Sequence, residues 1–199
     1  MRRSRLFAIG AYWIVLTTLS WAAFQNSKSP QPDAQKLANA LANLQRTPED
    51  PQVQRTYLDS FPLDYKSFLQ LFDYYHVLYD GHDYIQILGT LATAHELEVG
   101  RLLVQLSKDA HYEADAPSYL QHLTAAYGSK HPVTFATLLK ELSPKDRSNL
   151  ITFLADVEVH SSYPEYQNIV KELRARHQIE LAKQFELARE NRQRKGHLH

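Results

Sequence analysis

The chain has 199 residues, of which 44% are hydrophobic and 22% are charged, and its formal net charge is zero. This composition is typical of a folded globular protein and excludes a disordered chain. The sequence contains no cysteine, which excludes thiol catalysis, iron–sulfur clusters, cysteine-ligated zinc and disulfides, so an apolar core has to provide the stability.

The N-terminal residues have the pattern of an export segment. Three arginines, at positions 2, 3 and 5, precede the apolar run Leu6 to Phe24, and no further charged side chain occurs before Lys28. A run of about 19 residues is longer than the apolar part of a typical signal peptide and just long enough to cross a bilayer. The segment therefore predicts export of the remaining chain.

Two interpretations of this segment remain open. In one, residues 1–22 are a signal peptide that is cleaved after Ala22, with Ser20 as the second small residue of the cleavage motif. In the other, residues 6–24 stay in place as a transmembrane anchor with the arginines on the inner side. A buried helix of a soluble protein is a third, less favoured interpretation. The first two predict a periplasmic protein or one anchored to the inner membrane.

A helical region follows a short linker. Residues 23–32 are polar and contain two prolines, and from residue 33 to residue 188 apolar residues recur with helical spacing. The stretch 83–110 carries two apolar stripes, Gly128 is expected to end one helix, and the last helix is expected to run from Pro164 through Phe185. Acidic, serine or threonine caps and first-turn prolines predict helix starts at residues 33, 50, 64, 82, 115, 131, 143 and 164.

This pattern predicts an all-α fold. No segment alternates with period two over any length, and glycine-containing hairpin signals are missing. Short connections favour a compact, irregular multi-helix domain of antiparallel helix pairs. A solenoid is the less favoured alternative, because the helix starts keep no constant period.

Several short motifs resemble a set of uncharacterised exported helical proteins of Gram-negative bacteria. The chain contains "TYLDSFPLDYKSFLQLF", then "LYD", "DAPSYLQHL" and "LITFLADV", and that set has a leader, an FP-x-[DN]-[YF] element, LYD and a DA-x-x-YL helix. The resemblance covers roughly residues 56 to 160 and departs where the set often has "GYDD" and this chain has "DYYHV". It implies fold and export, with no activity or cofactor.

The stretch "FDYYHVLYDGHDY", residues 72–84, is the richest in chemically useful side chains. Its Asp-Gly pair is a turn signal, which favours an aromatic-rich connection with Asp80 or His82 at the start of the next helix. The alternatives are a lip that binds a small ligand or peptide and a hydrolase site, metal-dependent or acid–base, near residues 75–83. The candidate binding residues are Tyr75, His76, Asp80, His82 and Asp83.

No other motif predicts chemistry. "HELE", residues 95–98, lacks the second histidine of the zinc-protease helix and is interpreted as a solvated helix start. Walker loops, dinucleotide fingerprints and G-x-S-x-G are missing. We therefore predict no catalytic residue, no metal ligand and no cofactor.

Charge is unevenly distributed along the chain. Removal of residues 1–22 takes three arginines from the 22 basic residues and leaves 19 against 22 acidic ones. From Lys171 to the end there are 8 basic and 4 acidic residues, so residues 23–170 keep 11 basic and 18 acidic ones. We interpret residues 189–199 as a basic disordered tail whose charge belongs to a solvated helix end.

Together these patterns predict an exported binding or scaffold protein of the bacterial cell envelope rather than an enzyme. The expected partner is another envelope protein or a peptide, together with the membrane itself if the N-terminal segment is uncleaved. Nucleic acid is an unsuitable partner for an exported chain. A small metal-dependent or acid–base hydrolase remains the alternative.

Overall fold

The computed structural model describes residues 33–72, 78, 81–111, 116–156 and 163–195. The chain divides into two compact units, Met1–Pro30 and Gln31–His199, and every described residue belongs to the second. The leader or anchor and the linker predicted for residues 1–32 lie outside the described residues. In the part that is described, no helix is both long enough and apolar enough to cross a bilayer.

The second unit is compact and helical, which confirms the predicted all-α class. The described residues contain no strand and form the helices α2 (Ala34–Arg46), α3 (Pro51–Leu58), α4 (Tyr65–Phe72), α5 (His82–Leu91), α6 (Glu96–Ser107), α7 (Ala116–Lys130), α8 (Pro132–Glu141), α9 (Pro144–Ala155), α10 (Tyr163–Ala175) and α11 (Ile179–Lys195).

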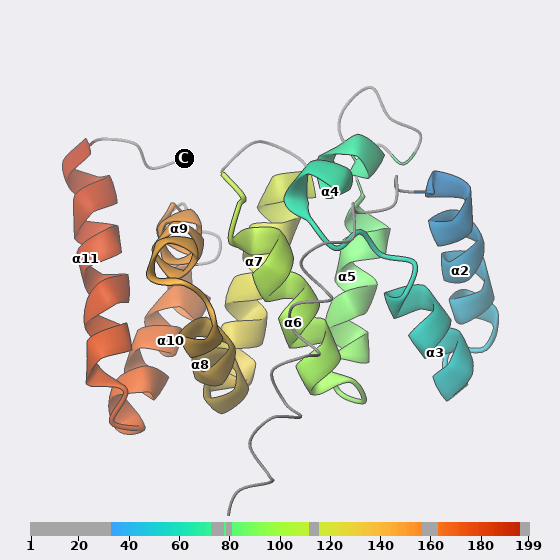
Figure 1. The fold of residues 1–199 in the computed structure, drawn as a ribbon. Helices are drawn as coiled ribbons and strands as arrows, with labels where there is room; N and C mark the ends of the chain where they lie inside the picture. The colour runs from blue at the N-terminus through green and yellow to red at the C-terminus, as the bar shows by residue number, and fades with distance from the viewer. Residues whose placement is uncertain (1–32, 73–77, 79–80, 112–115, 157–162, 196–199) are drawn as a thin grey trace, which may run out of the picture. The chain divides into compact units, whose positions relative to one another are not determined.

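Successive helices pack against each other in most of the unit, and α7 also packs against helices that are distant in the sequence. Contacts join α2 to α3, α5 to α6, α6 to α7, α7 to α8 and α10 to α11, and α7 also contacts α5, α9 and α10. Figure 1 shows α7 among these helices, with α5 and α10 on either side of it. The exposed part of α7 therefore lies between two other helices.

Local capping explains where several helices begin. The Asp33 carboxylate accepts from the Lys36 amide at 2.9 Å, and the Ser143 hydroxyl accepts from the Asp146 amide at 3.1 Å. Asp50 caps α3 in the same way. Each cap satisfies an amide that would otherwise lack a partner in the first turn, and all three starts were predicted.

Two breaks interrupt the helical pattern, and only the second was missed. The stretch 83–110 forms two helices, because α5 ends at Leu91 and α6 begins at Glu96 with His95 as its N-cap, at the helix start predicted for residues 95–98. The expected last helix also breaks, at His177, whose φ of 58° is left-handed. There the Gln178 amide donates to the Leu173 carbonyl at 2.8 Å, which closes a helix end that usually carries glycine.

Two further expectations were wrong. Gly128 does not end α7, which continues to Lys130; a Cβ on this glycine would lie 2.7 Å from the Phe135 ring, so its role is close helix packing. The helical region does not end at 188 either, because α11 reaches Lys195. Arg189, expected in a disordered tail, is buried and donates to the Ala155 carbonyl at 2.8 Å.

The core is apolar and includes side chains from every described helix. Leu88 and Leu103, on the two stripes of the stretch 83–110, are both fully buried. The Tyr57 hydroxyl ties α3 to α5 by donating to the Tyr84 carbonyl at 2.6 Å. Burial, with a smaller contribution from Tyr84, raises the pKa of Tyr57 well above the usual value for a phenol.

A candidate binding groove on helix α7

Of the five predicted site residues, the structure describes two. Tyr75, His76 and Asp80 lie outside the described residues. The connection ends at Gly81, the N-cap of α5, whose φ of 63° is left-handed. His82 and Asp83 are then the first two residues of α5, so His82 lies at the start of this helix as predicted, and the N-cap is Gly81.

His82 is held by its neighbours on α5 and α7. Its Nδ1 lies 3.2 Å from the Asp83 carboxylate and its Nε2 lies 2.7 Å from the Gln86 amide nitrogen. This pair of bonds fits an imidazole that donates from Nδ1 and accepts at Nε2. The ring also meets Tyr119 edge-on, with centroids 4.9 Å apart. His82 therefore connects the predicted stretch to Gln86 and Tyr119.

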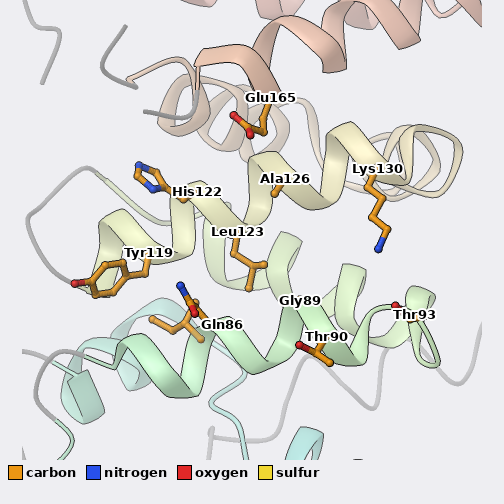
Figure 2. A pocket seen from close by; sticks show the side chains of 11 residues that line it. Gln86, Gly89, Thr90, Thr93, Tyr119, His122, Leu123, Ala126, Lys130 and Glu165 are labelled. Carbon is orange, nitrogen blue, oxygen red and sulfur yellow. The ribbon is translucent and has the colours of Figure 1, made fainter. Parts of the chain in front are cut away.

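Gln86 and Tyr119 line a groove that runs along the exposed face of α7, with α5 on one side and α10 on the other (Figure 2). Its volume is about 530 Å³. The lining residues are Ile85, Gln86, Gly89, Thr90 and Thr93 from α5 and the turn after it, Tyr119, His122, Leu123, Ala126 and Lys130 from α7, and Glu165 from α10.

Helical spacing builds the polar part of the lining. Gln86 and Thr90 are one turn apart on α5, so their side chains share a face. His122, Ala126 and Lys130 are likewise spaced by four residues on α7, and Figure 2 shows them following one another along that helix. Amides, hydroxyls and a cation are thus presented in rows rather than at a single point.

Small residues make room for the groove. A Cβ on Gly89 would lie 3.0 Å from Leu123 Cδ1, so the glycine lets α5 approach α7 closely. Ala126 is exposed and short, which leaves the space above α7 open. Ile85, Leu123 and Ala126 contribute apolar lining, and most of the other lining side chains are polar.

Glu165 is the carboxylate of the groove. It lies in the first turn of α10, and Figure 2 shows it reaching toward α7 near His122 and Ala126. Its Oε2 atom is buried and has no hydrogen-bond partner among the described residues. The same holds for Gln121 Oε1 and Asp156 Oδ1, but of these three side chains only Glu165 lines the groove, so its carboxylate is a candidate for contact with a ligand.

The groove presents several kinds of hydrogen-bonding group. Its side chains include a carboxylate, an ammonium group, an amide and several hydroxyls, which together can bind both donors and acceptors. Within the described ranges, no group of three or more histidine, aspartate or glutamate side chains could hold a metal ion. His95 is also structural: its ring bonds to Gln54 at 2.8 Å and lies 3.2 Å from Glu98, so the predicted helix start is confirmed but its side chain is not solvated.

Sequence reasoning missed the groove almost entirely. Gln86, Thr90, His122 and Lys130 look like any solvated helix positions, and nothing in the sequence places Glu165 beside them. Only His82, which contacts two lining residues, pointed toward this part of the molecule. The signal was the cluster of polar and aromatic residues at the start of α5.

No protein family, curated protein or solved structure matches this chain in comparisons with each. The resemblance of residues 56–160 to exported helical bacterial proteins stays a prediction. Function is therefore argued from the groove and the export pattern alone.

Proposed function

We propose that this chain is an exported binding protein of the bacterial cell envelope, without catalytic activity, that holds an extended polypeptide segment on the exposed face of α7. The observation that carries the proposal is the groove, which is lined by α5, α7 and α10 with both polar and apolar side chains. A polypeptide segment offers matching groups, because its backbone is polar and its side chains include apolar ones.

The length of the groove supports an extended peptide. Its α7 side runs from Tyr119 to Lys130, which at 1.5 Å per residue is about 16 Å of helix. An extended chain rises about 3.3 Å per residue, so four or five residues fit along it. A compact small molecule would use only part of this length.

The chemistry of the walls supports the same ligand. Backbone amides of an extended peptide present donors and acceptors at regular intervals, and the side chains of Gln86, Thr90 and Thr93 offer both kinds of group along one wall. Leu123 and Ala126 provide apolar surface for the peptide's side chains. This combination is usual for sites that bind peptides by main-chain contacts with a few side-chain pockets.

The alternative, a hydrolase near residues 75–83, has less support. The two candidate residues of that stretch that the structure describes, His82 and Asp83, are at the start of α5, and the two ring nitrogens of His82 are bonded to Asp83 and Gln86. A histidine engaged in this way positions the groove rather than attacking a substrate. We therefore keep His82 and Asp83 as flanking residues of the binding site.

The test is to fill the groove. Ala126→Trp places an indole on the exposed face of α7, and Ala42→Trp does the same at an exposed position in the middle of α2. Chain purified from the envelope of its host is titrated with a fluorescein-labelled pentapeptide library that varies one position at a time. We expect pentapeptides to bind wild type and Ala42→Trp equally, and Ala126→Trp at least tenfold more weakly, as expected when a contact surface worth about 1.4 kcal/mol or more is lost.

Two outcomes contradict the proposal. If no pentapeptide binds the wild-type chain, the groove is not a peptide site. If binding is unchanged in Ala126→Trp, the peptides bind elsewhere. Thermal melts of both tryptophan variants check that the fold is intact.

Export is tested separately by the intact mass of the chain isolated from its host. The Ser20 and Ala22 pattern predicts a mature N-terminus at Ala23. A full-length mass in the membrane fraction would favour the anchor of residues 6–24 instead. A full-length mass in the soluble fraction would contradict both.

A further inference from the structure

Glu165 differs from most of the glutamates that the structure describes in helices. Glu180 also has no ion pair among the described residues, but its side chain is exposed and does not line the groove. Ion pairs within the chain bring a cationic or histidine side chain to the carboxylates of Glu96, Glu98, Glu141, Glu172, Glu186 and Glu190. Glu165 has no ion pair among the described residues, although its Oε2 is buried. The fold thus leaves one groove carboxylate without the cation that its counterparts have.

Glu165 lies in the first turn of α10, and this position does not give its carboxylate a bonding partner. The positive end of a helix stabilises a carboxylate nearby, which explains why a glutamate is tolerated there. However, no donor among the described residues bonds to Oε2. The half-buried Glu165 side chain lines the groove, so its carboxylate faces a ligand that enters there.

The charge of the surrounding chain favours a cation at this place. Residues 23–170 carry 18 acidic and 11 basic side chains, so their field attracts positively charged ligands. Lys130 is the one lysine that lines the groove among the described residues, and it is one helical turn beyond Ala126. A ligand cation is therefore favoured at Glu165 and disfavoured at the Lys130 end.

We infer that the groove selects peptides that carry a lysine or arginine, and that this side chain places its cation against the Glu165 carboxylate. The inference rests on the proposed peptide-binding function and names the class of peptide. A charged donor would give the Glu165 carboxylate a cationic partner, and a bond between ionised groups is stronger than one between neutral groups. Selection then comes from the one carboxylate of the groove lining rather than from its neutral polar side chains.

The experiment compares three pentapeptides and three proteins. The peptides are acetylated, amidated and labelled, and their central residue is lysine, norleucine or glutamate in an otherwise identical alanine–glycine sequence. The proteins are the wild-type chain, Glu165→Gln, and Glu180→Gln as a matched control. Glu180 is also a first-turn glutamate, in α11, but it is exposed and does not line the groove.

We expect wild type and Glu180→Gln to bind the lysine peptide about tenfold or more tightly than the norleucine peptide, as for a hydrogen bond to a charged group. Glu165→Gln should bind these two peptides equally, because its amide keeps the shape and lacks the charge. The glutamate peptide should bind most weakly to wild type. Norleucine has nearly the length of lysine, so the comparison isolates the ammonium group.

The outcomes separate this inference from the function on which it rests. If pentapeptides bind and Ala126→Trp blocks them, but lysine and norleucine peptides bind wild type equally, the cation inference is wrong and the peptide groove stands. If the lysine preference persists in Glu165→Gln, another residue provides it and the inference is also wrong. If no pentapeptide binds, both fail. The wild-type comparison of the peptides decides the matter even if Glu165→Gln folds poorly.

Discussion

The two faces of helix α7 use similar side chains for different purposes. On the groove face, polar groups such as His122 and Lys130 are exposed. On the opposite face Gln121 is buried, and its amide donates to the carbonyls of Phe153 at 2.6 Å and Asp156 at 3.1 Å. A polar side chain on the buried face bonds to backbone groups of another helix, whereas those on the groove face are exposed to solvent.

The polar group on the buried face of α7 bonds to carbonyl groups at the C-terminal end of α9. The last carbonyls of a helix have no partner within it and carry partial negative charge. Arg189 of α11 donates to the Ala155 carbonyl, and Arg192 pairs with the Asp156 carboxylate at 3.0 Å. We name Gln121, Asp156, Arg189 and Arg192 the α9 junction. Its side chains satisfy groups that folding removes from water, which the groove side chains do not do.

Arg192→Ala should have the largest effect. The Asp156 side chain is 3% exposed, so removal of its partner leaves a buried carboxylate without a counter-charge, and we expect a loss of about 3 to 5 kcal/mol in the free energy of unfolding. Urea titration measures it. Arg194→Ala is the matched control, because Arg194 is 75% exposed on the same helix and should cost about 0.5 kcal/mol or less. Equal losses would show that the α9 junction is no more important than the surface.

Gln121→Ala tests the two faces directly against Gln86→Ala. Gln121 donates to two buried carbonyl groups, and leaving buried acceptors without a donor costs about 1 to 3 kcal/mol. Gln86 is exposed, so its replacement should change the free energy of unfolding by about 0.5 kcal/mol or less. Equal losses in the free energy of unfolding for Gln86→Ala and Gln121→Ala would show that the two faces of α7 contribute alike to stability.

Alkaline pH should lower the free energy of unfolding through the buried tyrosines Tyr57 and Tyr127. Burial, helped by Tyr84 and Glu96 respectively, raises the pKa of Tyr57 and Tyr127 above the usual 10.0. The unfolded chain then loses these protons at a pH where the folded chain keeps them, so their contribution to stability is complete below pH 10 and falls as the pH rises. The free energy of unfolding should fall by about 1.4 kcal/mol per pH unit for each tyrosine.

Urea titrations on the two sides of pH 10 measure this loss, and Tyr57→Phe should reduce the slope because one of the two phenols is gone. Tyr57→Phe also removes the hydrogen bond to the Tyr84 carbonyl, so its stability at neutral pH is compared first. A slope that is the same in wild type and variant would mean that the Tyr57 proton is not linked to folding.

His82 lies beside the groove, and His82→Ala should lower the free energy of unfolding by about 1 kcal/mol or less. Its side chain is 40% exposed, and its partner Asp83 is 81% exposed. The core position Leu88, buried on the same helix, provides the contrast, since Leu88→Ala should cost about 2 to 5 kcal/mol. Thermal melts of the two variants side by side test this. A His82 variant as unstable as the leucine variant would place the histidine in the core of the fold.

EDTA should have no effect on the melting temperature. A metal held only by the folded chain would add its binding free energy to stability, and no suitable group of ligands occurs among the described residues. A chelator-sensitive melt that disappears in His82→Ala would reverse this expectation and restore the metal-dependent alternative for residues 75–83.

The sequence alone determined the features that depend on neighbours a few residues apart. The caps at Asp33, Asp50 and Ser143 bond to amides two or three residues onward, and Leu88 and Leu103 lie on apolar stripes, so starts and buried faces were predictable. The all-α class follows from the same spacing. The turn at Gly81 was predicted for the same local reason.

Tertiary structure decided what depends on distant residues. Gln121 and Asp156 meet across 35 positions, and Ala155 and Arg189 across 34, so arginines that look like a basic tail become part of the core. The left-handed His177 interrupts a continuous helical pattern without a glycine. The groove arises in the same way, because α5 and α10 are placed on either side of α7 by packing. No spacing along the chain encodes which exposed faces will lie side by side.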